Sequence, residues 1–97
     1  MDTEGIEFPG EDEHWDSSVQ SIIFYACIGK KRIKCSISQI ALTDYFHTED
    51  TKEKALELFN EHRIRVNRLA ERLIQEDKFN EKGKVFIKYQ DCEKYVL

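Results

Sequence analysis

The sequence of 97 residues lacks a long hydrophobic run, and this excludes a transmembrane helix, which needs about 18 consecutive apolar residues. Its start, Met1-Asp2-Thr3-Glu4, is acidic and lacks the basic and apolar stretches of a signal peptide. Cysteine is scarce. Cys27, Cys35 and Cys92 are an odd number at wide spacings, without the close pairs that disulfide frameworks and zinc sites use. These absences predict a cytoplasmic protein with reduced thiols.

The sequence also lacks an excess of basic residues. It has 19 acidic against 15 basic residues and a net charge of −4, which argues against a dedicated nucleic-acid coat protein. The hydrophobic fraction of 40% is too high for a disordered chain, and the charged fraction of 35% is too high for a membrane protein. The length fits one domain over residues 1–97, with its core within about 5–90.

The first third of the chain predicts strands. Residues 6–8 alternate apolar and polar side chains before Pro9-Gly10, and the acidic stretch 11–16 is predicted as a loop held by Trp15. Residues 19–28 are rich in β-branched and aromatic side chains. A glycine-containing turn and a second alternating segment at 33–37 follow, which is typical of a β-hairpin.

The middle of the chain predicts two helices. Ser36 with Gln39, or Ser38 alone, can cap a short helix that ends near Phe46. A second, long helix is predicted from about Asp50 to about Asp77, because apolar residues recur there at helical spacing. This stripe comprises Ala55, Phe59, Val66, Leu69 and Leu73, and His62 fills its one gap.

A last strand is predicted over residues 85–89, and residues 91–97 remain without an assigned element. The predicted order is therefore β-β-β-α-α-β. Strands segregated from helices are typical of an α+β domain, here a small, mostly antiparallel sheet with a short and a long helix packed on one face.

Several short motifs occur in a characteristic order: Ile-x-Phe-Pro, a Trp, Phe-x-Ala, Cys-x-Ile-Ser-x-x-Ala-Leu and an Arg-Ile pair. The residues are Ile6, Phe8, Pro9, Trp15, Phe24, Ala26, Cys35, Ile37, Ser38, Ala41, Leu42, Arg63 and Ile64. In this order the chain resembles a family of short bacterial proteins known only as a domain of unknown function (number 1488). The resemblance implies a small cytoplasmic α+β protein and carries no established activity.

Catalytic motifs are absent from the sequence. A nucleophile–base pair would have to come from Cys35 or Cys27 with His62, but a cysteine on an alternating strand is usually a small buried side chain. No G-x-S-x-G, HExxH, Walker A or G-x-G-x-x-G pattern occurs. We therefore predict that the protein is not an enzyme and binds no cofactor.

A metal site is likewise not indicated. His14, His47, His62 and the three cysteines are scattered, without the close pairing of ligands typical of zinc sites. The acidic stretch 11–16 lacks the ligand order and central glycine of an EF-hand, so it is interpreted as a solvated loop.

Two basic clusters are candidates for binding phosphate. The hairpin carries Lys30, Lys31, Arg32 and Lys34, and one face of the long helix carries Arg65, Arg68 and Arg72. Together they would suit a small RNA- or DNA-associated regulator. Acidic residues at helical spacing from the arginines favour a neutralised, solvated face, and lysines at a hairpin tip also protect a sheet edge from aggregation.

The leading hypothesis from the sequence is a non-enzymatic accessory or regulatory protein that acts through protein–protein contacts. A sheet covered on one face leaves the other in need of cover, and Ile23, Tyr25 and Phe86 are expected to be partly exposed there. His62 and Arg63 are further candidates for partner binding, with Arg63 alternatively pairing with a carboxylate between helix and sheet. The expected assembly is a homodimer or a complex with another protein.

Overall fold

The centre of the fold is an antiparallel hairpin of β3 (Ser21–Ile28) and β4 (Lys31–Ser38) in the computed structural model, which describes residues 5–97. The turn consists of Gly29 and Lys30, and Gly29 has a φ of 59°, which glycine adopts without steric cost. The predicted hairpin is confirmed. Residues 1–4, where the sequence indicates no signal peptide, lie outside the described residues.

Three short strands extend this hairpin into one sheet. β1 (Ile6–Glu7) and β2 (His14–Asp16) both pair antiparallel with β3, whereas β5 (Val85–Ile87) pairs in parallel with β4. The sheet order is β1-β3-β4-β5, with β2 also on β3, so the sheet is mostly antiparallel, as predicted. The prediction of a loop over 11–16 is wrong in part, because Trp15 pairs opposite Ile22 and packs against the core.

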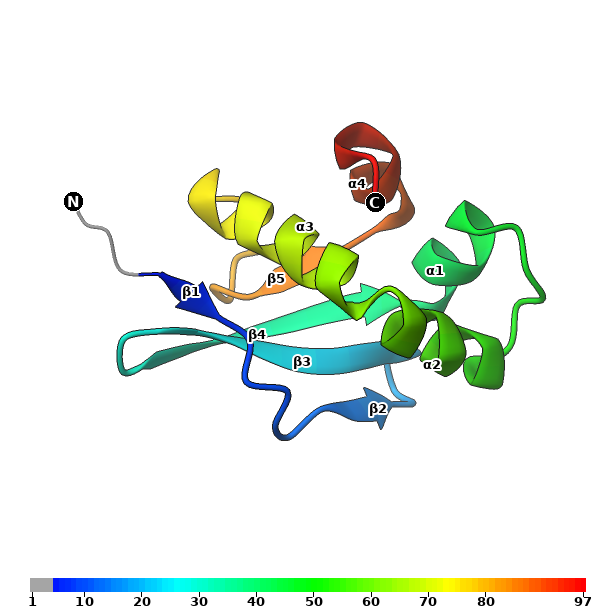
Figure 1. Ribbon diagram of the computed structural model, residues 1–97, viewed down its shortest axis with the longest axis horizontal. Coiled ribbons are helices and arrows are strands. Elements are labelled where there is room, and N and C mark those ends of the chain that lie inside the picture. The colour runs from blue at the N-terminus through cyan, green and yellow to red at the C-terminus, as the bar shows by residue number, and fades with distance from the viewer. Residues whose placement is uncertain (1–4) are drawn as a thin grey trace.

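All four helices lie on the same side of the sheet (Figure 1). They are α1 (Gln39–Tyr45), α2 (Lys52–Glu61), α3 (Arg63–Gln75) and α4 (Tyr89–Tyr95). This arrangement confirms the predicted α+β class with helices on one face. Within residues 5–97, no helix has the length and hydropathy needed to cross a bilayer.

Side-chain caps fix where the first two helices begin. Ser38 is the N-cap of α1, and its Oγ accepts a hydrogen bond of 3.0 Å from the backbone N–H of Ala41. The N-cap of α2 is Thr51, whose side chain accepts a hydrogen bond from the backbone N–H of Lys54, close to the predicted start of the helix at about Asp50. The Asp50 carboxylate faces α1 and receives a hydrogen bond from Gln39.

The predicted long helix from Asp50 to Asp77 is wrong, because the chain breaks at His62 into α2 and α3. His62 has a φ of −110° and a ψ of 26°, outside helical values, although no proline or glycine marks the position. Contacts with distant segments hold both sides of the break. The His62 ring stacks on Phe46 at 4.2 Å, and the Arg63 guanidinium pairs with Glu13. We attribute the break to these two contacts.

The hydrophobic core fills the space between the sheet and the helices. Phe24 lies at its centre and contacts the rings of Phe8 and Phe59, with ring centroids 6.2 and 5.5 Å apart. The segment 91–97, which the sequence left without an element, belongs to this core: Cys92 in α4 and Leu97, beyond the end of that helix, are both buried. The Asp91 carboxylate accepts a hydrogen bond from the backbone N–H of Lys88. α4 therefore begins where the last strand had been predicted to continue.

Candidate functional site

Strand alternation gives the sheet two faces of different character. On β3, Ile22, Phe24 and Ala26 point toward the helices and belong to the core. The residues between them, Ile23 and Tyr25, point to the opposite face, which no helix covers (Figure 1). We call this second face the open face.

Register assigns the remaining residues of the open face. Opposite β3, the residues of β4 that share this face are Arg32, Lys34, Ser36 and Ser38. Because Ser36 pairs with Phe86 on the neighbouring strand β5, the Phe86 ring lies on this face as well. It is 40% exposed, which confirms the predicted partial exposure of Phe86.

A hollow of about 260 Å³ lies on the open face between β3, β4 and β5. Its lining includes Ile23, Ser36, Phe86 and Val19, and Val19 is 55% exposed. We call it the sheet-face hollow. The prediction that Ile23 would be partly exposed is wrong: its side chain is 1% exposed, so Phe86 and Val19 provide the accessible apolar surface.

Three lysines, Lys34, Lys82 and Lys84, surround the sheet-face hollow, and one carboxylate, Asp16, lies among them. Asp16 accepts hydrogen bonds from the hydroxyl and the backbone N–H of Ser18, and these bonds lower the pKa of the Asp16 carboxyl. None of the three ammonium groups forms an ion pair with another residue of 5–97. The lining of the hollow therefore combines apolar side chains with a net positive charge.

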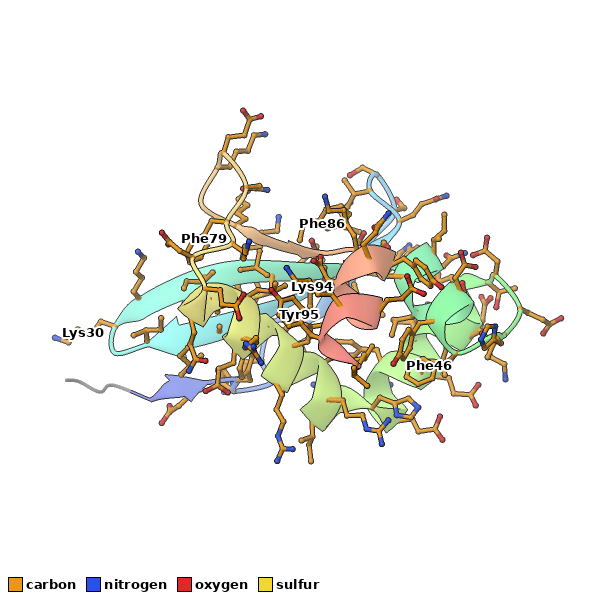
Figure 2. All side chains as sticks on the ribbon, turned by 90° about the horizontal axis from the view of Figure 1, so that it is seen from above. Lys30, Phe46, Phe79, Phe86, Lys94 and Tyr95 are labelled. Atoms are coloured by element: carbon orange, nitrogen blue, oxygen red, sulfur yellow. The ribbon has the colours of Figure 1, made fainter. Side chains whose placement is uncertain are left out.

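A second hollow, of about 270 Å³, lies on the helix side of the same strand. Leu73 of α3 and Phe79 provide its apolar wall, and Lys78, Lys88 and Asp91 provide its charges. We call it the edge hollow, since Phe86 and Asn80 line both hollows. Viewed onto the helix layer, β5 runs along the outer side of the sheet with Phe79 and Phe86 beside it (Figure 2).

The candidates for partner binding divide between two sides of the molecule. Tyr25 is half-buried on the open face, beneath the guanidinium of Arg32 at 4.0 Å from the ring centroid. His62 and Arg63 lie in the helix layer, where His62 stacks on Phe46. Arg63 donates hydrogen bonds to Glu13 and to Asn60, which confirms the predicted pairing of Arg63 with a carboxylate between helix and sheet.

The candidates for phosphate binding are separated in the same way. Lys30 projects from the tip of the hairpin (Figure 2), and Lys31 lies beside it at the start of β4. On the open face Arg32 pairs with Asp12 at 3.3 Å. The arginines of α3 lie in the helix layer, so the hairpin and helical clusters do not form one basic surface.

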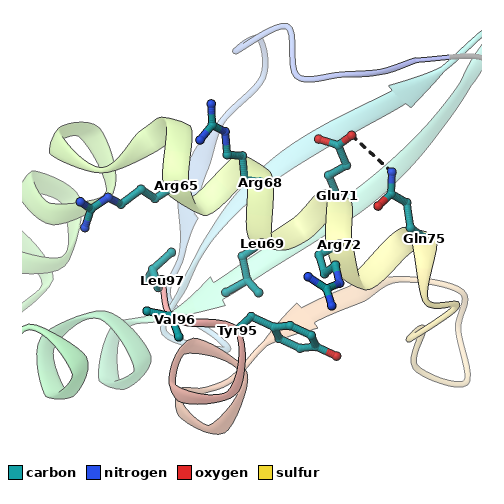
Figure 3. A pocket seen from close by; sticks show the side chains of 9 residues that line it. All are labelled: Arg65, Arg68, Leu69, Glu71, Arg72, Gln75, Tyr95, Val96 and Leu97. Atoms are coloured by element: carbon teal, nitrogen blue, oxygen red, sulfur yellow. Dashed lines mark hydrogen bonds between the residues drawn. The ribbon is translucent and has the colours of Figure 1, made fainter.

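The helical arginines also do not converge on a common point. A pocket of about 530 Å³ between α3 and α4 is lined by Arg65, Arg68 and Arg72, but Arg65 and Arg68 extend away from Val96 and Leu97 on its other side (Figure 3). Arg72 forms an ion pair with Glu76, with 2.5 Å between Nε and Oε2. The pocket therefore lacks the converging donors that hold a phosphate.

Neither of the two thiols in the core is an accessible nucleophile. Cys35 and Cys92 are fully buried, and desolvation raises the pKa of each thiol to about 12. Cys27 lies half-buried on the open face. In the part of the chain that the structure describes, no three side chains of His, Cys, Asp or Glu are grouped closely enough to hold a metal ion.

Sequence reasoning missed the lysines of the sheet-face hollow that follow α3. Lys82 and Lys84 belong to a turn in which Asn80 Oδ1 accepts hydrogen bonds from both of their backbone N–H groups. The lysines at 82, 84 and 88, which flank the apolar run Val85-Phe86-Ile87, were a usable signal. The place of these lysines in the fold, however, depends on the parallel pairing of β5 with β4, which brings them beside Lys34.

The comparisons with known proteins all lead to one family, and none of the matched proteins is described with an activity. The model of the family described as "Protein of unknown function (DUF1488)" matches residues 6–87. The uncharacterized protein YrdB of Escherichia coli K12 is 34% identical over 84 residues, covering 87% of this chain and 96% of that protein, and YrdB of Shigella flexneri is 33% identical over the same coverage. A crystal structure of a DUF1488 protein of unknown function from Shewanella loihica PV-4 has a TM-score of 0.78 and 28% identity, covering 90% of this chain and 96% of that one.

Proposed function

We propose that this chain, which belongs to the DUF1488 family, is a non-enzymatic accessory or regulatory protein that acts through protein–protein contacts on its open face. One observation carries the proposal. The sheet has helices on one side only, and the uncovered side holds an apolar hollow with Phe86 and Val19 exposed beside it. Exposed apolar groups gathered around a hollow and rimmed by polar residues are typical of interaction sites.

The state of the thiols supports a role without catalysis. Only the thiolate acts as a nucleophile, and the raised pKa values of Cys35 and Cys92 keep both protonated at neutral pH. Neither thiol is reachable by a substrate, since both are fully buried. The proposal places the protein in the cytoplasm, where its three free cysteines stay reduced.

The partner we propose is a different protein rather than a second copy. A twofold contact whose axis passes through the sheet-face hollow would place Lys34, Lys82 and Lys84 of one copy close to the same lysines of the other. Like charges facing each other oppose association. The homodimer expected from the sequence stays a prediction, which light scattering on the untagged protein checks directly.

The alternative function, a small nucleic-acid-associated regulator, depends on the hairpin lysines and the helical arginines acting together. They lie on different sides of the molecule, and Arg32 and Arg72 already pair with carboxylates. Binding of nucleic acid would show as an ultraviolet absorbance excess in the eluted protein that salt removes.

The experiment that tests the proposal is site-specific photocrosslinking in growing cells of the source organism. A photoreactive phenylalanine analogue replaces Phe86 on the open face, and the matched control replaces Ile64, which is 67% exposed in the helix layer. We expect a discrete protein adduct at position 86 that is absent at position 64 and lost when Lys34→Glu is added. An adduct at neither position, or only at 64, overturns the proposal, and an adduct of twice the chain mass identifies a second copy as the partner.

A further inference from the structure

The sheet-face hollow is smaller than a typical site for a small-molecule ligand. Its volume is about 260 Å³. Pockets that enclose drug-sized ligands measure about 300–1,000 Å³. The apolar part of its lining comes from Val19, Ile23 and Phe86, of which Val19 and Phe86 are exposed at 55% and 40%. The hollow therefore suits one apolar side chain that projects from a protein better than it suits a free organic ligand.

The charged groups that line this hollow do not balance. Lys34, Lys82 and Lys84 line it together with one carboxylate, Asp16. Hydrogen bonds from Ser18 lower the pKa of the Asp16 carboxyl, so Asp16 is ionised at neutral pH and carries its full negative charge. Three lysines against one aspartate give the lining a net charge of +2, in a chain whose net charge is −4.

The excess of positive charge continues past Phe86 into the edge hollow. Lys78 and Lys88 line that hollow with one carboxylate, Asp91. None of the five lysines of the two hollows forms an ion pair within residues 5–97. The Phe86 ring, which lines both hollows, thus lies between two groups of lysines, and an acidic ligand is attracted to it from either side.

The hydrogen-bonding groups that remain available in the sheet-face hollow are mainly donors. Asn80 Oδ1 already accepts from the backbone N–H groups of Lys82 and Lys84, which leaves the side-chain NH2 group of Asn80 to donate. Each lysine ammonium has three donors and no acceptor. The turn is also closed by a hydrogen bond of 2.8 Å from the Asn80 N–H to the Lys84 carbonyl, so the two lysines extend from a fixed backbone. An ionised carboxylate only accepts hydrogen bonds and therefore complements this lining.

We propose that the partner contacts the open face through an acidic segment with one apolar side chain at its centre. The apolar side chain enters the sheet-face hollow beside Phe86, and the flanking carboxylates pair with Lys34, Lys82 and Lys84. This inference rests on the proposed function and specifies the chemical class of the partner. Burial of the apolar side chain supplies affinity, and the lysines select for negative charge.

Single-stranded nucleic acid also carries negative charge, but the open face does not suit its bases. Proteins that bind such strands stack successive bases on several aromatic side chains. Among the lining residues of the sheet-face hollow, Phe86 is the only aromatic one. Tyr25, on the same face, is half-buried beneath the guanidinium of Arg32. These observations favour an acidic protein segment over a nucleic acid.

A capped peptide of sequence Glu-Glu-Leu-Glu-Glu is the probe for this site. Its titration into the isotope-labelled full chain should shift the backbone amide signals of Ile23, Ser36 and Phe86. Two matched peptides, one with Gln in place of each Glu and one with Ala in place of Leu, should each bind at least about 10-fold more weakly, a difference of roughly 1.4 kcal/mol. Equal binding of the Gln peptide overturns the selection for acidic segments, and equal binding of the Ala peptide overturns the apolar anchor.

Charge variants of the protein locate the binding site. Lys82→Glu with Lys84→Glu should abolish binding, whereas Lys30→Glu with Lys31→Glu, the same change of charge at the hairpin tip, should leave it unchanged. Asp16→Asn removes the opposing carboxylate and should strengthen binding about 3-fold. Because this last variant is expected to gain affinity, a loss of folded protein cannot imitate its effect, and unchanged or weaker binding contradicts the placement of the acidic segment in this hollow.

The outcomes separate this inference from the function on which it rests. Absence of peptide binding, with the crosslinked partner at position 86 retained, overturns the acidic segment and leaves the proposed function standing. Absence of both overturns both. Peptide binding that the hairpin-tip variants remove places the acidic site elsewhere and overturns the inference. Tighter binding of a short oligouridylate to the same residues also overturns it, in favour of nucleic acid.

Discussion

The two faces of β3 differ more than any other two surfaces of the molecule, although they alternate residue by residue along one strand. On the helix side, Phe24 is surrounded by Phe8 and Phe59 and is inaccessible to solvent. On the open face, Tyr25 is half-buried under Arg32, and Phe86 of β5 is exposed. The comparison shows that one face is packed into the core, whereas the other keeps accessible aromatic side chains.

The open face is not uniformly accessible, however. Ile23 is as buried as the core residues, although it shares the lining of the sheet-face hollow with the exposed Val19 and Phe86.

The largest expected effect comes from truncating the same side chain on each face. Phe24→Ala should lower the free energy of unfolding by about 3–5 kcal/mol, because it leaves a cavity in the core. Phe86→Ala should lower it by about 1 kcal/mol or less, because the ring already contacts water. Urea denaturation of both variants measures the difference. Equal losses would mean that the open face contributes to folding as much as the core does.

Alkylation of the cysteines compares the two faces chemically. Iodoacetamide should modify Cys27 on the open face of the native protein, while Cys35 on the helix side reacts on the order of 100-fold more slowly. Burial raises the pKa of the Cys35 thiol to about 12, and alkylation requires an accessible thiolate. Mass spectrometry of digested samples follows each site. In strong urea the two rates should converge, and convergence in the native state would contradict the burial of Cys35.

Much of this two-faced architecture could be predicted from the sequence, because it depends on neighbouring residues. Alternation in residues 19–28 and 33–37 predicted the hairpin, and Ser38 predicted the start of α1. The break at His62 could not be predicted, since the two contacts to which we attribute it involve Phe46 and Glu13, which are distant in the chain.

The candidate site was predicted only in part for the same reason. Phe86 was identified as exposed, but Ile23 was misjudged, because it is 1% exposed although it lies on the face that no helix covers. The lysines at 82 and 84 reach Lys34 only after the chain has crossed the helix layer and returned as a parallel strand. A pairing of this kind is set by tertiary structure and leaves no periodic signal in the local sequence.

The ion pair between Arg63 and Glu13 connects the segment between β1 and β2 to the helix layer. Its coupling energy measures how strongly this edge of the sheet is held to that layer. Both side chains are partly buried, at 36% and 18% exposed, so a double-mutant cycle with alanine should give a coupling of about 1–2 kcal/mol. The more exposed pair of Lys54 and Glu57 serves as the control and should give about 0.5 kcal/mol or less. A coupling at Arg63 no larger than the control would show that the segment is held by apolar contacts alone.

The smallest expected effect is a pH dependence on the outer surface of the helix layer. The hydroxyl of Tyr95 donates a hydrogen bond to Glu76, and this bond, with that of Arg72, lowers the pKa of the Glu76 carboxyl below its ordinary 4.5. Because the pKa is lower in the folded chain, the contribution to stability is present above about 4.5 and is lost as the pH falls through the lowered value. Tyr95→Phe should raise the pKa of Glu76 toward 4.5 in a carbon-detected NMR titration, whereas Tyr89→Phe, whose hydroxyl bonds Glu93, should leave it unchanged. If the Glu76 titration is unaltered in Tyr95→Phe, the lowered pKa of Glu76 comes from Arg72, and Tyr95 of α4 does not contribute to it.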